Sequence, residues 1–325
     1  MGNYLARRIL QSAIVIFGVT FISFIALHLA GDPTYLYVSD RASNEEIAEI
    51  RSRLGFDRPL PEQYLTYMGD LLRGDFGTSL VSRTSALDMI LTRLPATIEL
   101  TLFALFIAIL FAVPIGIIAA LRRGTAVDGG IMLFAIIGQS MPNFWLGIML
   151  ILFVGLQLRW LPISGHVPVL QPILDGETGV AIQNIPEAFR HLLMPGITIA
   201  VFSLSRNARL VRSTMLEVLS QDYVRTARAK GLKQRGVIWN HALRNALIPV
   251  VTIIGLEFGF LLSGVVVVET VFSWPGVGRL IFNSINQRDI PVVQAAVVLL
   301  SLMFVGLNLI VDLIYVRLDP RIRLS

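Results

Sequence analysis

Long apolar blocks alternate with shorter polar segments along the chain. An α-helix needs about 20 mostly apolar residues to cross a bilayer. We therefore predict six transmembrane helices, at 9–30, 96–121, 129–158, 191–211, 247–272 and 292–316. The first block exceeds the roughly 7–15 apolar residues of a signal peptide and is followed by no small-residue cleavage motif, so we expect it to remain as a helix.

The polar segment 31–95 carries helix signals of its own. Ser43 and Glu46 have the spacing of a capping box, in which each side chain accepts a hydrogen bond from the other residue's backbone N–H. Apolar stripes follow at helical spacing, and Gly55 and Gly74 are suited to the two helix ends. We predict two short amphipathic helices here, and local packing explains them more simply than a docking role. Segment 159–190, with four prolines and three glycines, predicts an irregular loop.

The basic residues predict the orientation in the membrane. With the N-terminus inside, the inner segments 1–8, 122–128, 206–246 and 317–325 hold 16 of the 27 Lys and Arg but only four of the 22 acids. Positive residues concentrate on the cytoplasmic side of membrane proteins, so we place both termini there. The expected organisation is an N-terminal helix (1–30), an external segment (31–95), a five-helix core (96–316) with an inner loop at 206–246, and a tail (317–325).

Composition excludes several functions. The chain is 54% hydrophobic and 15% charged, against about 45–50% and 25% in soluble domains, and its mean hydropathy is +0.71. Only Lys230 and Lys233 are lysines, and neither precedes Ser or Thr, so no phosphate-binding loop exists. No cysteine, paired-histidine zinc motif or G-x-S-x-G motif is present. We predict no enzyme, no bound metal and no nucleic-acid partner.

The basic segment 206–246 contains a candidate partner-binding helix. Ser220 or Asp222 is a good N-cap, and Gly231 suits the position after the helix end. Ala227 and Ala229 would let another protein approach the backbone closely. The alternative is a basic loop that only obeys the charge rule or binds anionic lipid. The capped helix with small residues favours a protein partner.

Six stretches carry a resemblance to a known family: RLPATIEL at 93–100, QSMPNFW at 139–145, DYVRTARAKG at 222–231, ALIP at 246–249, VETVFSWPGVG at 268–278 and LDPRIR at 318–323. Together they resemble the permeases of ABC importers, in the dipeptide/oligopeptide/nickel transport family. The stretch 222–231 is similar to the EAA loop of these permeases, although residues 225–227 are R-T-A, a usual variation in the peptide branch. The resemblance covers nearly the whole chain.

The resemblance implies a fold, partners and a source of energy. It implies an all-α membrane protein of the type I ABC importer permease fold, in the bacterial inner membrane. This chain would form half of a pore with a second homologous permease. Two cytoplasmic ATPases would bind ATP and Mg, an external solute-binding protein would deliver the solute, and no cofactor would bind this chain. The implied coupling helix to the ATPases comprises Asp222, Tyr223, Arg225, Thr226, Ala227, Arg228, Lys230 and Gly231.

The implied solutes are di- and oligopeptides, with glutathione, nickel chelates, opines or sugars as alternatives. A less favoured alternative is an ion-coupled secondary transporter, which would normally show paired repeats and a complete pathway in one chain. Neither feature is evident in the sequence.

Polar residues inside the predicted spans are candidates for the translocation pathway. Pro142 removes a helix hydrogen bond, and Gln139 and Asn143 are four residues apart on one face if the helix continues. A kink satisfied by neighbouring helices is an equally good reading. Glu257 and Glu269 are intramembrane carboxylates, which are costly to isolate. For Glu257 we favour pairing across the interface with the second permease over contact with a cationic group of the solute.

Overall fold

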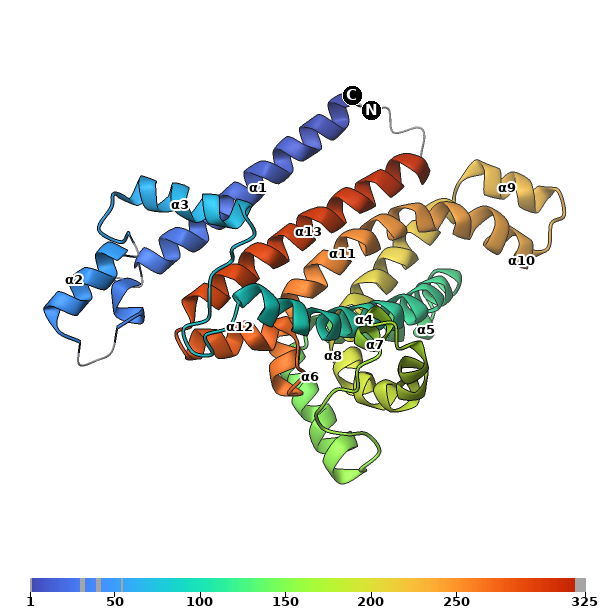
Figure 1. The fold of residues 1–325 in the computed structure, drawn as a ribbon. Helices are drawn as coiled ribbons and strands as arrows, with labels where there is room; N and C mark the ends of the chain where they lie inside the picture. The colour runs from blue at the N-terminus through green and yellow to red at the C-terminus, as the bar shows by residue number, and fades with distance from the viewer. Residues whose placement is uncertain (1, 30–32, 39–41, 54, 319–325) are drawn as a thin grey trace. The chain divides into compact units, whose positions relative to one another are not determined.

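The computed structural model describes residues 2–29, 33–38, 42–53 and 55–318. Within these ranges the regular elements are helices, apart from one isolated antiparallel bridge between Thr78 and Ser85 (Figure 1). The chain divides into two compact units, one formed by residues 1–94 and 279–325 and the other by residues 95–278. The all-helical prediction is confirmed.

The described part of unit 1 consists of the 3₁₀-helix η1 and four α-helices, together with the start of α4 and most of α12. The elements are α1 (Gly2–Leu29), η1 (Pro33–Leu36), α2 (Asn44–Arg53), α3 (Leu60–Leu72), α4 (Ala86–Leu121), α12 (Val277–Asn286) and α13 (Ile290–Leu318). The predicted capping box is confirmed, because the Ser43 N–H donates to the Glu46 carboxylate at 2.9 Å and the Glu46 N–H donates to Ser43 Oγ at 3.2 Å. Helices α1 and α13 pack along each other.

Polar contacts tie the part of unit 1 that we predicted to be external to α1 and to the start of α13. The Thr20 and Tyr64 hydroxyls lie 2.9 Å apart, joining α1 to α3. Before α13, the buried Asp289 carboxylate accepts from Ser79 Oγ at 2.5 Å and from the Leu80 N–H at 3.0 Å. The segment predicted as external therefore has a packed structure of its own.

Unit 2 contains most of α4 and the remaining helices. These are α5 (Ala126–Ser140), α6 (Asn143–Leu150), the π-helix η2 (Ile151–Gln157), α7 (Leu170–Leu174), α8 (Thr178–Leu219), α9 (Asp222–Ala229), α10 (Gln234–Gly236), the π-helix η3 (Val237–Leu243) and α11 (Arg244–Val271). Buried Ala104, Ala108 and Ala112 of α4 join one apolar cluster with residues of α8 and α11. Small residues at this spacing let helix backbones pack closely, which is how helices associate in lipid.

Three described helices are long and apolar enough to cross a bilayer: 86–121, 178–219 and 290–310. The pair α5 and α6–η2 would form a fourth crossing if its two bent parts count as one, and residues 10–26 form a shorter apolar helix. The bend between these parts is 101°. Pro142 follows the end of α5 and occupies the N-cap of α6, so it breaks the helix completely rather than kinking it.

The prediction of an irregular loop over 159–190 was wrong for its second half. Helix α8 already begins at Thr178 and continues through Pro186 and Pro195. Ala181 and Ala188, seven residues apart on one face, are both buried. A proline removes only one backbone donor, and the packing of this face outweighs that loss.

Candidate functional site

The segment predicted as a coupling helix forms a helix, α9, although its start differs from the prediction. Lys230 is its C-cap and Gly231 follows with a φ of +76°, a conformation that glycine adopts without strain. The N-cap position is Gln221, which makes no side-chain capping bond, rather than Ser220 or Asp222. Ser220 instead closes the preceding helix, since its Oγ donates to the Glu217 carbonyl at 2.7 Å.

One face of α9 is buried against its own chain. Val224 and Ala227 form an apolar cluster with Val237 of η3, which Val218 and Leu219 of α8 flank. Ala227 therefore does not lie on the exposed face as we expected, and Ala229 is the small residue that does. The exposed side carries mainly polar groups: Asp222, Tyr223, Arg225, Thr226, Arg228 and Lys230.

A side-chain bond also links α9 to the start of α11. Asn245 Nδ2 donates to the Tyr223 hydroxyl at 3.0 Å, while Tyr223 itself is 43% exposed. The π-helix η3, which packs against α9, continues through Arg244 directly into α11. These contacts link α9 to both α11 and α8. Sequence reasoning missed η3, because a π-turn leaves no distinct residue pattern.

Two arginines of α8 bind α5. Arg212 forms a two-pronged ion pair with Asp128, at 2.6 Å from Nε to Oδ1 and 2.8 Å from Nη2 to Oδ2. Such paired N–H···O bonds fix orientation as well as distance. Arg209 donates to the Gln139 side chain near the end of α5. Because the helix breaks after Ser140, Gln139 and the half-buried Asn143 do not share a helix face, contrary to our expectation.

Glu257 of α11 is paired with α8 inside the same chain. Its side chain is 3% exposed, and Asn207 Nδ2 donates to Oε2 at 2.5 Å. Asn207 also donates to Ser203 Oγ at 3.2 Å. Among the described residues, Glu257 Oε1 and Asn207 Oδ1 have no hydrogen-bond partner. We expected a partner for Glu257 across the interface with the second permease. In this chain one of its carboxylate oxygens is paired with Asn207 of α8.

Glu269 fastens the turn that follows α11 to the start of the buried part of α4. Its fully buried carboxylate accepts from Thr97 Oγ1 at 2.7 Å, and the same hydroxyl oxygen accepts from the Val277 N–H at 2.8 Å. Trp274 Nε1 donates to the Ala96 carbonyl at 2.9 Å. The contact leaves no room for a side chain at Gly278, where a Cβ would lie 2.6 Å from the Val266 Cα.

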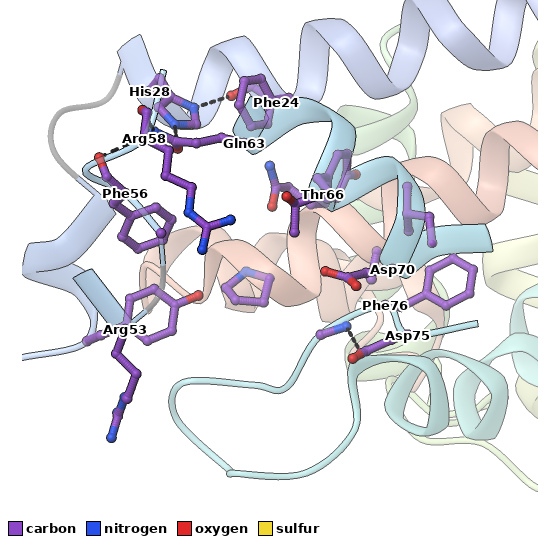
Figure 2. A pocket seen from close by; sticks show the side chains of 18 residues that line it. Phe24, His28, Arg53, Phe56, Arg58, Gln63, Thr66, Asp70, Asp75 and Phe76 are labelled. Atoms are coloured by element: carbon purple, nitrogen blue, oxygen red, sulfur yellow. Dashed lines mark hydrogen bonds between the residues drawn. The ribbon is translucent and has the colours of Figure 1, made fainter. Parts of the chain in front are cut away.

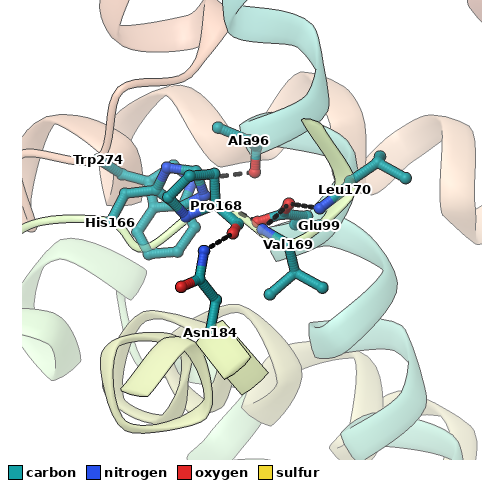
Figure 3. Close-up of polar contacts among 8 residues, drawn as sticks. All are labelled: Ala96, Glu99, His166, Pro168, Val169, Leu170, Asn184 and Trp274. Carbon is teal, nitrogen blue, oxygen red and sulfur yellow. Dashed lines mark hydrogen bonds and ion pairs between the residues drawn. The ribbon is translucent and has the colours of Figure 1, made fainter. Parts of the chain in front are cut away.

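Glu99, which sequence reasoning left without a role, holds the loop before α7 (Figure 3). Its carboxylate accepts hydrogen bonds from the Val169 N–H, at 2.9 Å, and from the Leu170 N–H. It also lies 2.7 Å from His166 Nε2. The His166 ring meets the Trp274 ring edge-on, with centroids 4.5 Å apart. Glu99 and Glu269 therefore anchor two adjoining loops on α4. We call Thr97, Glu99, His166, Glu269 and Trp274 the Glu99–Glu269 network.

Comparison with known proteins identifies the family. Residues 112–324 match the family described as binding-protein-dependent transport system inner membrane component, and residues 1–101 match the corresponding N-terminal family. The chain belongs to this family. It is therefore an inner membrane component of a transport system rather than an enzyme, and the resemblance predicted from its motifs is confirmed.

Curated relatives of this permease family match over almost their full length. The di/tripeptide transport system permease protein of Pseudomonas aeruginosa is 42% identical, with 99% of each chain covered. A dipeptide transport system permease protein of Alkalihalophilus pseudofirmus is also 42% identical, over 99% of this chain and 100% of the relative. A glutathione transport system permease protein of Salmonella choleraesuis is 41% identical, over 99% of both.

A solved structure shares the fold. A chain from the crystal structure of an amino acid ABC transporter with histidines superposes with a TM-score of 0.51 at 14% identity, covering 71% of this chain and 94% of that one. At this identity the likeness concerns the fold alone. It agrees with an ABC importer permease architecture built from apolar helices.

Proposed function

We propose that this chain is the permease subunit of an ATP-driven importer of di- and oligopeptides. The observation that carries the proposal is the match to di/tripeptide and dipeptide permeases at 42% identity over 99% of this chain. A second candidate solute is glutathione, which is supported by the 41% identical relative of that name. Glutathione is itself peptide-like, so both candidates require a site for an ammonium and a carboxylate group.

The proposed membrane arrangement has the type I importer permease fold, with six spans and both termini in the cytoplasm. The strong excess of Lys and Arg in segments 1–8, 122–128, 206–246 and 317–325 supports this orientation. In this arrangement 31–95 is external and α9 is cytoplasmic. The exposed charges of α9 would then face other cytoplasmic proteins.

The proposed partners supply energy and solute. A second homologous permease would complete the pore, two cytoplasmic ATPases would bind ATP and Mg, and an external solute-binding protein would deliver the peptide. The absence of any Lys-Ser or Lys-Thr pair in the sequence supports an external source of energy, because a phosphate-binding loop needs that pair.

The proposed coupling step runs from α9 into the spans. When the ATPases close on ATP, they would move α9 through its exposed residues Tyr223, Arg225 and Arg228. The Val224–Ala227–Val237 cluster would carry this motion to η3, and η3 continues into α11. The ion pair of Arg212 with Asp128 would pass the motion of α8 to α5. Packed helices transmit such motions because they shift as rigid elements.

We also propose that the break around Pro142, with Gln139 and Asn143, lines the translocation pathway. Broken helices are tolerated at membrane depth where they face protein or a water-filled cavity. We assign to Glu257 and Glu269 the role of holding the helices beside this pathway in position. Uptake of peptides with free and acetylated N-termini by Glu257→Gln tests this assignment. A changed preference between the two peptides would show that Glu257 contacts the solute instead.

The decisive experiment is uptake by the reassembled transporter. This chain, its second permease and the two ATPases would be reconstituted in proteoliposomes with the external binding protein, using labelled Ala-Phe and glutathione as separate probes. We expect Ala-Phe to be taken up only when hydrolysable ATP is supplied on the side of the membrane where the ATPases lie. Uptake of glutathione alone would replace the peptide assignment. Uptake driven by an ion gradient without ATP would contradict the importer class.

A further inference from the structure

Unit 1 contains a cavity that the translocation mechanism does not use. Its volume is about 440 Å³, and α1, α3 and α13 contribute to its walls together with Arg53 and the loops at 55–58 and 75–77 (Figure 2). Small-molecule sites typically have volumes of about 300–1,000 Å³. The cavity is therefore large enough for an amino acid or a short peptide.

Hydrogen bonds of the Gln63 side chain hold one wall of this cavity in place. Gln63 Nε2 donates to the carbonyls of Arg58, at 2.8 Å, and of Phe56, at 3.3 Å. These two bonds fix the amide orientation, so that Oε1 faces His28 Nε2 at 2.9 Å. The Gln63 side chain thus holds the loop that carries Arg58 against α1 and α3, and the position of Arg58 at the cavity is set by the fold.

Opposite charges face this cavity from different elements. Figure 2 shows the Arg58 guanidinium and the Asp70 carboxylate reaching toward the same space from opposite sides. Among the described residues the Arg58 side chain has no hydrogen bond or ion pair, and Asp70 has only an exposed ion pair with Arg73 at 3.7 Å. Both charges are thus available to a ligand that carries a carboxylate and an ammonium group.

The remaining walls offer apolar contacts and one unused polar atom. Phe24, Phe56 and Phe76 line the cavity. The buried hydroxyl of Tyr67, which also lines it, has no hydrogen-bond partner among the described residues. Burial raises the pKa of Tyr67 to about 12, so the hydroxyl keeps its proton and can donate at physiological pH. Buried polar groups are normally paired, and a ligand would supply the missing acceptor.

We propose that this cavity of unit 1 is a second binding site for small zwitterionic peptides, distinct from the polar groups of unit 2. Arg58 would bind the peptide carboxylate, Asp70 the ammonium group, and the phenylalanines a side chain. Arginine suits the first role because its planar N–H groups match both carboxylate oxygens. This inference rests on the proposed function for the identity of the solute, though not for the chemistry of the cavity.

The headgroup of an ethanolamine phospholipid also carries an anion and an ammonium group. In that lipid, however, the apolar part lies beyond the phosphate and not between the two charges. A peptide places its side chains between its charged ends, so aromatic rings in the same cavity as Arg58 and Asp70 fit a peptide better.

Binding can be measured on the complete transporter without the external binding protein and without ATP. The complex would be held in phosphatidylcholine nanodiscs, and saturation-transfer NMR would follow Ala-Phe, N-acetyl-Ala-Phe and Ala-Phe amide. We expect Arg58→Ala to weaken Ala-Phe binding by about tenfold, because a charged hydrogen-bond partner is lost. Arg83→Ala removes an exposed arginine of unit 1 that lies outside the cavity, and it should leave the affinity unchanged.

The modified peptides test each charge separately. Asp70→Asn should weaken Ala-Phe binding by about tenfold but leave the already weak binding of N-acetyl-Ala-Phe unchanged, since that peptide has no ammonium group.

Equal affinities of Arg58→Ala and Arg83→Ala for Ala-Phe would overturn the proposal. Loss of peptide binding when phosphatidylethanolamine is added to the nanodiscs would assign the cavity to lipid instead. If Ala-Phe is taken up normally but these variants bind it like the wild type, only this inference fails; absent uptake of any peptide would refute the proposed function.

Discussion

The segments beyond the two ends of α11 are held in different ways. Beyond its C-terminal end, the Glu99–Glu269 network buries two carboxylates and surrounds them with backbone and side-chain donors. Near its N-terminal end, α9 is held by a small apolar cluster and one Asn245–Tyr223 bond, with its charges in solvent. With 28 residues at about 1.5 Å each, α11 separates these regions by about 42 Å.

This difference shows which region is built for rigidity. A buried carboxylate that loses a donor leaves an unpaired charge, so the network tolerates little movement. The α9 contact involves few apolar atoms and can shift at lower cost. We therefore expect substitutions in the network to lower stability and substitutions on exposed α9 to alter coupling instead.

The largest effect is expected at Gly278. In Gly278→Ala the new Cβ would meet the Val266 Cα at 2.6 Å and Glu269 Oε2 at 2.9 Å, so the backbone must shift. Overpacking of this kind should lower the free energy of unfolding by about 3 kcal/mol. Thermal unfolding of the purified chain in detergent measures it. Gly129→Ala, where a Cβ meets nothing within 4 Å, is the matched control and should not lower the melting temperature.

A smaller effect is expected for Thr97→Val. The substitution keeps the shape of the side chain but removes the donor to Glu269 and the acceptor for the Val277 N–H. We expect a loss of about 2 kcal/mol, since one of the two lost bonds involves a charged group. The control is Thr92→Val, because among the described residues the Thr92 hydroxyl bonds only to a carbonyl of its own exposed helix turn. Equal melting temperatures for the two variants would mean that the network does not stabilise the fold.

At α9 the expected effect is local. Ala227→Arg places a charge in the cluster with Val224 and Val237, so α9 should lose amide protection in hydrogen exchange while the melting temperature of the whole chain changes little. Ala229→Arg lies on the exposed face and should leave α9 protected. Both variants should reduce peptide-stimulated ATPase activity of the assembled complex. Loss of protection in Ala229→Arg as well would refute the assignment of the two faces.

The smallest change in stability is expected for Arg225→Ala. Its ion pair with Asp222, 3.4 Å long, is exposed, so the free energy of unfolding should change by less than about 0.5 kcal/mol. Coupling should nevertheless fall several-fold if Arg225 contacts an ATPase. Arg190→Ala, which also breaks an exposed i, i+3 ion pair, is the control for stability and should leave ATPase activity unchanged. Equal ATPase activities would remove Arg225 from the coupling surface.

Local patterns in the sequence predicted local structure well. The Ser43–Glu46 capping box, the presence of a helix at α9 and the glycine at its end depend on residues close in sequence, and all three are found, although the N-cap of α9 was misassigned. The break at Pro142 was predicted in place but underestimated in size, because one missing hydrogen bond does not determine a bend angle. The prolines of 159–190 were misleading because packing along α8 outweighs them.

Long-range polar partners could not be predicted. Asn207 and Glu257 are 50 residues apart, and Glu99 reaches loop residues about 70 positions away. Nothing in the spacing of these residues indicates which helices become neighbours. The inward orientation of Ala227 was missed for the same reason, since it depends on Val237 packing across from η3.

The proposed coupling step requires that the exposed face of α9 contacts the ATPases. Because the chain contains no cysteine, Arg228→Cys introduces a single thiol that can carry a photoactivatable cross-linker. In the assembled transporter we predict cross-linking of this site to an ATPase subunit, in an amount that changes when ATP is added. Glu62→Cys on α3, also exposed, should give no such product. Absence of an ATPase product from Arg228→Cys, or an equal yield from Glu62→Cys, would show that the exposed face of α9 is not an ATPase contact.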